Sequence, residues 1–592
     1  MIKEEFLQGQ SLEAYEYFGA HKTEGGTRFA TYAPNAENVT LMINGSEYPM
    51  ERDGDGVWSA VREGVSQGDI YQYIITTKAL QKHYRSDPFA FYSEVRPLNA
   101  SRVFDIDSYQ WQDAEWLAQR DKGYERPVNI YEVHFGSWRT KCDSEEDDRL
   151  YSYDEMAELL IPYVCEMGYT HIELMPLTEY PFDGSWGYQV TGYFSATSRY
   201  GDPAGLMRFI DACHRAGIGV ILDFVPVHFV TDFFALHMYD GGFLFESDME
   251  SERYSEWGTA LFDYSKPHVL SFVKSAINFW IEKYHVDGLR YDAVANLIYR
   301  HGHKDSPIND TGIWFLRNTN YAIQKRHPDV MLFAEDSTDY TKVTAPVEYG
   351  GLGFDYKWDL GFMHDTINYV KTPPYERRSH HNLMTFSMSY FYDNLYVLPY
   401  SHDEVVHGKM TMLDKCFGRH EEKIATVKAL YTFQFAHPGK KLNFMGNEIG
   451  EYMEWRPAKE IGWNLLTYPT HDSLHEYLKA LHHIYLSEPA LYGSDYNASG
   501  FRWCDANNNN QSVYAFVRKD SRGRSVYAVF NFSGLYQNYR LRVEENGQYT
   551  ELINSDRDIY SGSNCLNGEP WANGYMLDLR LAPLSCVLLK RK

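Results

Sequence analysis

The chain of 592 residues is about four times as long as a typical domain, so several domains are expected. Hydrophobic residues make up 44% and charged residues 23%, which is an ordinary globular composition and argues against disorder, collagen and coiled coil. The net charge of −25 repels phosphate backbones and anionic lipid surfaces, so nucleic acid and membranes are poor candidate partners and an uncharged partner is favoured.

Residues 1–110 predict a small β-sandwich. Short runs of β-forming residues are separated there by turn signals such as Pro34-Asn35 and Asn44-Gly45. The runs cover residues 27–32, 39–43, 57–61 and 70–76.

The texture changes at about residue 129, where compact apolar segments begin to alternate with helical patterns. In residues 267–284 apolar side chains recur at three- and four-residue steps behind the start signals Ser265 and Pro267, which predicts a helix that packs one face onto a sheet. Buried strands that alternate with helices are typical of a parallel sheet, and eight such units predict a (β/α)8 barrel over residues 111–490, with a doubly wound sheet as the alternative. The eight apolar segments are 130–133, 171–175, 220–224, 286–289, 330–333, 354–358, 395–398 and 441–445.

Residues 491–592 predict a second β-sandwich, because the helical patterns stop and short strands with polar turns follow. These strands are 512–518, 525–531, 539–543, 549–554, 575–579 and 585–589. The acidic run at 143–148 is expected to be a solvated loop.

The cysteines and the start of the sequence indicate a reducing compartment. The seven cysteines are scattered, odd in number and never spaced as CxxC, which argues against a disulfide framework or a zinc site. The first residues are acidic where a secretory signal would be apolar, and no apolar run reaches about 18 residues, the length that a membrane helix needs. We therefore expect a soluble, cytoplasmic protein.

Reactive side chains follow four of the predicted barrel strands. In barrels of this kind the active site lies at the carboxyl ends of the strands. Burying carboxylates there costs several kcal/mol unless they are paired or used. Each residue has a structural explanation when taken singly, such as a salt bridge or a helix cap, but four strand ends in one barrel favour a shared site. The residues are Asp223 and His228 on the third strand, Arg290 and Asp292 on the fourth, Glu335 on the fifth, and His402 and Asp403 on the seventh.

This set of residues suits chemistry on a glycosidic bond, which needs one ionised and one protonated carboxyl group. Arg290 lies two residues before Asp292 on the same strand face and should hold that carboxylate ionised. Glu335 follows an apolar strand, which favours the protonated form that a general acid needs. Asp223 is expected to orient Arg290 from behind.

The remaining residues suit sugar binding. Asp403 would hold sugar hydroxyls or oppose positive charge, while His228 and His402 would donate hydrogen bonds to hydroxyls. Aromatic residues make up 16% of the chain, and such rings stack on uncharged, hydroxyl-rimmed ligands such as sugars.

Longer motifs make the sequence similar to a known family. The strand-end segments 223–228, 288–292, 334–336 and 401–404 resemble the four conserved regions of the α-amylase superfamily. Within it, the chain closely resembles the glycogen (1,4-α-glucan) branching enzymes over nearly its whole length. The further motifs that carry this resemblance are Tyr-Glu-Val-His-Phe-Gly-Ser-Trp at 131–138, Gly-Ser-Trp-Gly-Tyr at 184–188, Gly-Leu-Gly-Phe-Asp-Tyr-Lys-Trp at 351–358 and Met-Gly-Asn-Glu at 445–448.

The resemblance implies a role for each matching residue. Asp292 would be the nucleophile, Glu335 the acid/base and Asp403 the stabiliser of the transition state. Tyr188 would stack beneath the sugar that is cleaved. Arg290, His228 and His402 would be substrate ligands.

The implied reaction breaks an α-1,4 bond with retention of configuration and forms an α-1,6 branch on a glucan such as glycogen, amylose or amylopectin. A retaining mechanism predicts carboxyl groups of Asp292 and Glu335 about 5 to 5.5 Å apart. We expect no metal, no organic cofactor and a monomer, with a glycogen-binding-like module in front of the barrel.

The chain departs from the family pattern at Asp339-Tyr340, Tyr291 and Val230-Thr231. The alternatives are an α-glucan hydrolase of the same superfamily, of amylase or trehalohydrolase type, and a glucan-binding scaffold without catalysis.

Overall fold

The computed structural model describes residues 2–143 and 146–592. Two units are distinguished by their internal contacts. The first consists of Met1–Asp121, Thr140–Ile161 and Glu173–Asp355, and the second of Lys122–Arg139, Pro162–Ile172 and Tyr356–Lys592. Each unit carries one β-sandwich.

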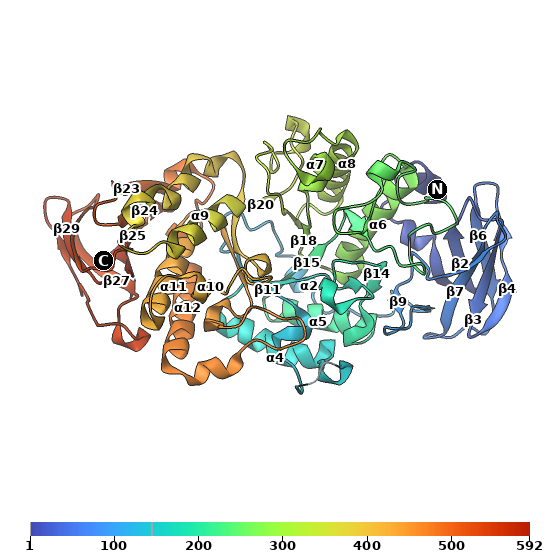
Figure 1. Ribbon diagram of the computed structural model, residues 1–592, viewed down its shortest axis with the longest axis horizontal. Helices are drawn as coiled ribbons and strands as arrows, with labels where there is room; N and C mark the ends of the chain where they lie inside the picture. The colour runs from blue at the N-terminus through green and yellow to red at the C-terminus, as the bar shows by residue number, and fades with distance from the viewer. Residues whose placement is uncertain (1, 144–145) are drawn as a thin grey trace. The chain divides into compact units, whose positions relative to one another are not determined.

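The first unit begins with a sandwich of two sheets, ordered β1-β2-β6-β5 and β4-β3-β7-β10-β9, with β8 paired to β7 (Figure 1). Phe29 of β2 and Tyr71 of β7 lie with ring centroids 5.0 Å apart, so the two sheets pack through aromatic side chains. The four predicted strands are present. The bounds are β1 Gly19–Thr23, β2 Gly26–Tyr32, β3 Asn38–Ile43, β4 Ser46–Pro49, β5 Glu51–Arg52, β6 Val57–Arg62, β7 Ile70–Thr76, β8 Lys82–Arg85, β9 Tyr92–Ser93 and β10 Ser101–Arg102.

The eight predicted strands form a closed barrel in chain order, β11-β12-β15-β18-β19-β20-β21-β22. This confirms the (β/α)8 prediction and excludes the doubly wound sheet. Asp223 of β15 pairs in register with Arg290 of β18, and Arg290 pairs with Phe333 of β19. The reactive residues at the carboxyl ends of these three strands therefore lie at the same height along the barrel. The bounds are β11 Asn129–Val133, β12 His171–Leu174, β15 Gly219–Phe224, β18 Gly288–Tyr291, β19 Met331–Ala334, β20 Tyr356–Trp358, β21 Tyr396–Tyr400 and β22 Lys440–Phe444.

Helices and short hairpins connect the barrel strands. The hairpins are β13 Thr178–Glu179 with β14 Gly192–Ala196, and β16 His228–Phe229 with β17 Ala260–Leu261. Helices α1 and α2 precede the first barrel strand, and α12 follows the last. The helix bounds in the described chain are α1 Ile2–Leu7, α2 Ala114–Leu117, α3 Phe135–Trp138, α4 Tyr153–Met167, α5 Pro203–Arg215, α6 Pro267–Tyr284, α7 Ala295–Ile298, α8 Asp310–Arg326, α9 Leu360–Lys371, α10 Met412–Lys415, α11 His420–Ala436 and α12 Pro469–Ser487.

Helix α6 has the predicted bounds and is more deeply buried than packing of one face onto a sheet requires. Its residues are buried from Val269 to Ile281, so a second side of the helix is covered as well. The N-terminal segment covers the other side, where the hydroxyl of Ser271 accepts the Ser11 N–H at 3.2 Å and that of Ser275 accepts the Ala14 N–H at 3.0 Å. Small polar residues on the helix thus satisfy backbone groups that would otherwise be buried without partners.

A buried histidine of α5 links the segment before the barrel to the start of the fourth barrel strand, β18. His214 of α5 lies between two carboxylates, with Nδ1 2.8 Å from Asp113 Oδ2 and Nε2 3.0 Å from Asp287 Oδ2. The rings of Trp116 and His214 stack at 5.4 Å. Burial alone would lower the pKa of His214, but the carboxylates of Asp287 and Asp113 outweigh it and raise the pKa to about 9.

The His214 pairing predicts a pH-dependent contribution to stability. A group whose pKa is raised on folding stabilises the folded state fully below its ordinary pKa of 6.5, and the contribution disappears as the pH rises through about 9. The shift corresponds to on the order of 3 kcal/mol. We expect His214→Gln to lower the free energy of unfolding much more at about pH 6 than above about pH 9.5, measured by denaturant titration. An equal loss at both pH values would mean that His214 is neutral in the folded protein.

The second unit ends in the C-terminal sandwich, whose sheets are ordered β23-β24-β25-β30-β27-β28 and β26-β29. Both sheets contribute to one core, which contains Ala515 and Val517 of β24 together with Leu541 of β26 and Leu577 of β29. The six strands predicted for this region are present, and β23 and β28 are additional to them. The bounds are β23 Phe501–Asn508, β24 Val513–Lys519, β25 Ser525–Asn531, β26 Gln537–Arg542, β27 Gly547–Asn554, β28 Trp571–Ala572, β29 Met576–Leu581 and β30 Ser585–Arg591.

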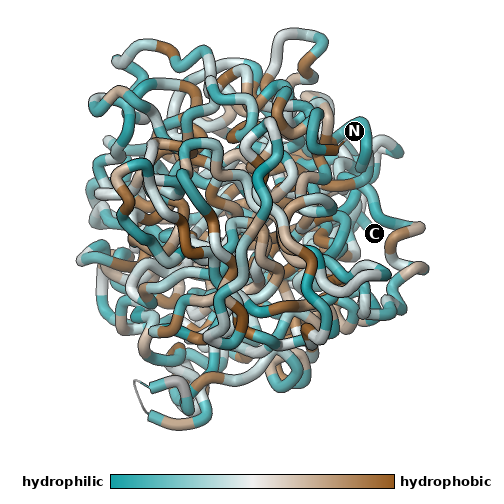
Figure 2. The backbone as a smooth tube through the Cα atoms, turned by 90° about the vertical axis from the view of Figure 1, so that its right-hand side faces the viewer, coloured by the Kyte–Doolittle hydropathy of each residue, from teal (hydrophilic) through white to brown (hydrophobic). Residues whose placement is uncertain are grey.

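Among the described residues, no helix is long and apolar enough to cross a membrane, and Figure 2 shows hydrophobic residues as short stretches between hydrophilic ones. Within the acidic run at 143–148, residues 144 and 145 lie outside the described residues, so the loop expected there is not assessed.

Candidate active site

Arg290 joins two carboxylates at the ends of neighbouring strands of the first unit. Its Nη1 donates to Oδ1 and Oδ2 of Asp223, both at 3.0 Å, and to Oδ1 of Asp292 at 2.7 Å. The ion pair that the Arg-x-Asp spacing predicted is therefore present. The side chains of Arg290 and Asp223 are each 1% exposed and that of Asp292 is 16% exposed, so Asp292 is the member of the group that solvent or a ligand can reach.

The charge of Arg290 is stabilised by its neighbours. Burial works to lower the pKa of the guanidinium, but the negative groups around it, Asp223 first, hold the pKa well above its usual range. The buried guanidinium makes charge-assisted hydrogen bonds to both carboxylates, which fix their positions. The arrangement therefore supplies an oriented carboxylate at Asp292, paired with a buried cation.

Glu335 is fixed beside Asp292 by the backbone of the neighbouring strand end. The Ala293 N–H donates to Oε2 of Glu335 at 2.9 Å, and the Glu335 N–H donates to the carbonyl of Tyr291 at 3.1 Å. Ala293 has a positive φ of 51°, a conformation that is uncommon outside glycine and often found at functional sites. The turn after β18 is thus shaped to present its amide to the Glu335 carboxylate.

Tyr188 and His228 lie in the same unit as this group. The Tyr188 hydroxyl donates to Oδ2 of Asp223 at 2.6 Å. His228 of β16 is buried, and its burial lowers the pKa of the imidazole although Asp292 opposes the shift. A largely neutral imidazole can donate to or accept from a sugar hydroxyl.

Trp257 also belongs to this region, although it was not singled out from the sequence. Its ring lies 5.1 Å from that of His228, and it is 47% exposed. A half-exposed indole beside a polar site is suited to stacking on a sugar ring. Only the general excess of aromatic residues hinted at it, because Trp257 stands in a long connection with no strand-end signal.

His402 and Asp403 belong to the second unit, where they follow the seventh barrel strand. The His402 backbone N–H donates to Oε2 of Glu132 at 3.0 Å, and its Nδ1 lies 2.5 Å from Oε1 of the same residue. His402 Nε2 lies 3.4 Å from Oδ1 of Asp403, whose side chain is 52% exposed. Glu132 therefore orients the histidine, and it was not singled out from the sequence although it lies in the 131–138 motif.

The structure thus places six predicted residues in the first unit, where hydrogen bonds join several of them, and two in the second. Among residues 2–143 and 146–592, no group of three or more His, Cys, Asp or Glu side chains is arranged to hold a metal ion. The predicted absence of a metal or cofactor stays a prediction. The first-unit residues are Tyr188, Asp223, His228, Arg290, Asp292 and Glu335, and those of the second unit are His402 and Asp403.

Three family descriptions match the chain. "Carbohydrate-binding module 48 (Isoamylase N-terminal domain)" matches residues 17–90, "Alpha amylase, catalytic domain" matches 158–257 and 254–531, and "Alpha amylase, C-terminal all-beta domain" matches 503–592. A solved structure of a pullulanase from Bacillus acidopullulyticus superposes with a TM-score of 0.75 at 17% identity, covering 97% of this chain and 75% of its own. That likeness concerns the fold.

Curated relatives are much closer in sequence. A 1,4-alpha-glucan branching enzyme GlgB from Bacillus caldolyticus is 45% identical over 95% of this chain and 86% of its own length. The enzyme of the same name from Geobacillus stearothermophilus is 45% identical over 96% of this chain and 90% of its own.

The closed barrel, its strand-end carboxylates and the matching catalytic domain define a glycoside enzyme of the α-amylase superfamily. The curated relatives identify the family within this superfamily. The chain belongs to the family of GlgB 1,4-alpha-glucan branching enzymes.

Proposed function

We propose that Asp292, Glu335 and Asp403 carry out the branching reaction by a retaining double displacement. The observation that carries this proposal is the bridge from Arg290 to Asp223 and Asp292, with Glu335 held at the next strand end. It pairs an anionic carboxylate with a second carboxyl group at neighbouring strand ends, which is what cleavage of a glycosidic bond requires.

In the first displacement an oxygen of Asp292 attacks the anomeric carbon of an α-1,4-linked glucose, and Glu335 gives its proton to the leaving oxygen. The α-1,4 bond breaks and a covalent glucosyl ester forms on Asp292. Arg290 orients Asp292 for the attack through the 2.7 Å hydrogen bond. The Ala293 amide fixes one oxygen of Glu335 in the same region.

In the second displacement the carboxylate of Glu335 takes the proton from the 6-hydroxyl of an acceptor glucan. The hydroxyl oxygen attacks the anomeric carbon, the ester to Asp292 breaks, and an α-1,6 branch forms. Two inversions restore the original configuration. Asp403 opposes the positive charge that develops on the sugar ring, and Glu132 holds His402 in place to bind a sugar hydroxyl.

Tyr188, His228 and Arg290 complete the proposed binding site, with Tyr188 beneath the sugar that is cleaved. The carbohydrate-binding module at residues 17–90 and the branching-enzyme relatives support an α-glucan of glycogen, amylose or amylopectin type as the substrate. We also propose a cytoplasmic monomer with domains 1–110, 111–490 and 491–592.

Incubation with amylose tests the branching reaction. We expect the iodine colour of amylose to fall while reducing ends rise little, because each cleaved chain is transferred to a second glucan. Release of short chains by an α-1,6-debranching enzyme measures the branches formed. The Asp292→Asn variant is the control, and it should change neither signal.

Reducing ends that rise in step with the loss of iodine colour would contradict branching and support an α-glucan hydrolase. Glucan binding without any change in amylose would support a scaffold.

A further inference from the structure

The loop that carries Tyr188 is closed at its base by a short hairpin. We call residues 180–191 the Tyr188 loop, because they connect Thr178–Glu179 of β13 to Gly192–Ala196 of β14. The carbonyl of Glu179 accepts the Thr191 N–H at 2.8 Å and the Thr191 hydroxyl at 3.1 Å. The loop therefore leaves and re-enters the hairpin at one point.

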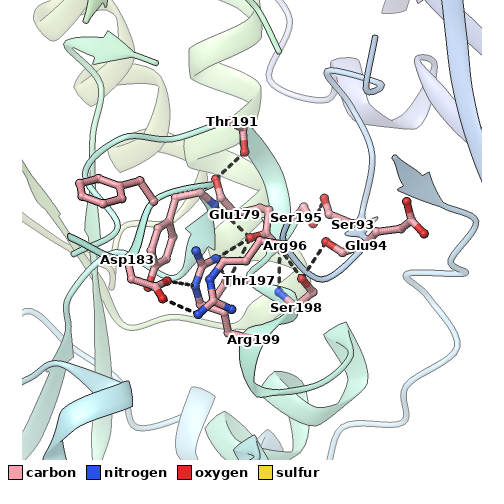
Figure 3. A network of polar contacts seen from close by, with 12 residues as sticks. Ser93, Glu94, Arg96, Glu179, Asp183, Thr191, Ser195, Thr197, Ser198 and Arg199 are labelled. Carbon is pink, nitrogen blue, oxygen red and sulfur yellow. Dashed lines mark hydrogen bonds and ion pairs between the residues drawn. The ribbon is translucent and has the colours of Figure 1, made fainter. Parts of the chain in front are cut away.

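Arg199 holds this base together. Its Nη1 donates to Oε1 of Glu179 and its Nε to Oδ1 of Asp183, both at 2.8 Å (Figure 3). The guanidinium also lies 3.6 Å from the centroid of the Tyr180 ring. The side chains of Arg199 and Glu179 are 2% and 8% exposed, so this ion pair forms away from water, whereas the side chain of Asp183 is 44% exposed.

The N-terminal sandwich adds a second arginine to the same carboxylate. Arg96, in the segment between β9 and β10, donates through Nη2 to Oδ2 of Asp183, while Arg199 binds Oδ1 (Figure 3). Strand β9 and this segment are joined to β14 and the residues after it by further polar contacts. The hydroxyls of Ser93 in β9 and Ser195 in β14 lie 2.9 Å apart, and the Ser198 hydroxyl donates to the Glu94 carbonyl at 3.0 Å. Each oxygen of Asp183 thus has its own guanidinium, one of them from the sandwich.

A continuous set of contacts leads from this carboxylate to the candidate nucleophile. Asp183 opens a 3-10 turn, Asp183–Ser185, and Tyr188 follows soon after that turn. The Tyr188 N–H donates to the Ser185 carbonyl at 3.0 Å, which ties Tyr188 to the turn. Beyond Tyr188 the contacts continue through Asp223 and Arg290 to Asp292, as described above.

We propose that Arg96 is a positioning residue for catalysis, which acts through Asp183 and the Tyr188 loop to hold the Tyr188 hydroxyl on Asp223. Arg199 alone fixes one oxygen of Asp183 and leaves the carboxylate able to rotate about that contact. The second guanidinium removes this freedom, because two separate donors define the plane of the carboxylate. This inference rests on the proposed roles of Tyr188 and Asp292.

A double-mutant cycle between Arg96 and Tyr188 tests the inference. We expect Arg96→Ala to lower kcat for amylose about tenfold with little change in KM, because the loop loses its position and not a sugar contact. Tyr188→Phe removes the hydroxyl that reaches Asp223. In the Tyr188→Phe background, Arg96→Ala should lower kcat less than about threefold, because both changes break the same chain of contacts.

Arg62→Ala is the matched control. Arg62 lies in the same sandwich and donates to the carbonyls of Val61 and Pro49, away from the loop, so its replacement should leave kcat unchanged. If Arg96→Ala gives little folded protein, Arg96→Lys is measured in the same cycle with the same criterion.

The proposal would be overturned if the fold-losses in kcat caused by Arg96→Ala and Tyr188→Phe multiply in the double variant. It would also be overturned if Arg96→Ala raised KM alone, because Arg96 would then act in glucan binding. The failure of this inference is distinguishable from that of the proposed function. If Asp292→Asn abolishes turnover while the cycle is multiplicative, only the role of Arg96 is wrong.

Discussion

Asp292→Asn is expected to lower the turnover of amylose by roughly four orders of magnitude or more, because the amide cannot form the covalent glucosyl ester. The fold should survive the change. Arg290 keeps both oxygens of Asp223 at 3.0 Å, so the buried guanidinium stays neutralised when Asp292 loses its charge. Initial rates of branching measure the loss.

Glucan binding separates a chemical defect from a folding defect in this variant. Asp292→Asn should still bind maltooligosaccharide, as measured by calorimetry, since the other proposed ligands remain. Asp154→Asn is a matched control, because Asp154 pairs with Arg208 on the surface through exposed side chains. Turnover of Asp292→Asn within about tenfold of the unchanged protein would exclude Asp292 as the nucleophile.

Glu335→Gln is expected to lower turnover of amylose by about 10² to 10⁴-fold, the usual contribution of a general acid. The amide of glutamine can keep the contact with the Ala293 N–H through its carbonyl oxygen, so the site should retain its shape. What is lost is the proton for the leaving oxygen.

The leaving group of the donor provides the measurement for Glu335. A maltosyl fluoride needs little protonation to leave, so formation of the glucosyl ester from it should be much less impaired than cleavage of amylose. Fluoride release in a single turnover reports that step. Equal losses with both donors would rule out Glu335 as the acid.

Much of the fold was predictable because its signals are local. The bounds of α6 agree with those expected from apolar spacing, with Pro267 at the first turn, although Lys266 and not Ser265 precedes the helix. The barrel strands were located from apolar runs. The observed bounds of most strands differ from the predicted ones by a few residues, as for β19, which was predicted at 330–333 and lies at Met331–Ala334. The two-sided burial of α6 was not predictable, because the segment that covers it is far away in the chain.

In the candidate site, too, some contacts were predictable from neighbouring residues in the sequence and others were not. The pair formed by Arg290 and Asp292 follows from a spacing of two residues on a strand, and the structure contains it. The contact between His402 and Glu132 joins residues 270 positions apart, and that between Arg96 and Asp183 joins residues 87 apart. No local pattern announces either of them.

The number and order of the barrel strands, the reactive residues at their ends and the family that these residues indicate could all be recognised from the amino-acid sequence. Strand periodicity and strand-end chemistry are properties of neighbouring residues, so they can be recognised in one dimension. The distant partners that hold such residues, Glu132 for His402 and two arginines for Asp183, became known from the folded structure. Such pairs depend on strand register and loop closure, which bring together side chains that the chain itself keeps far apart.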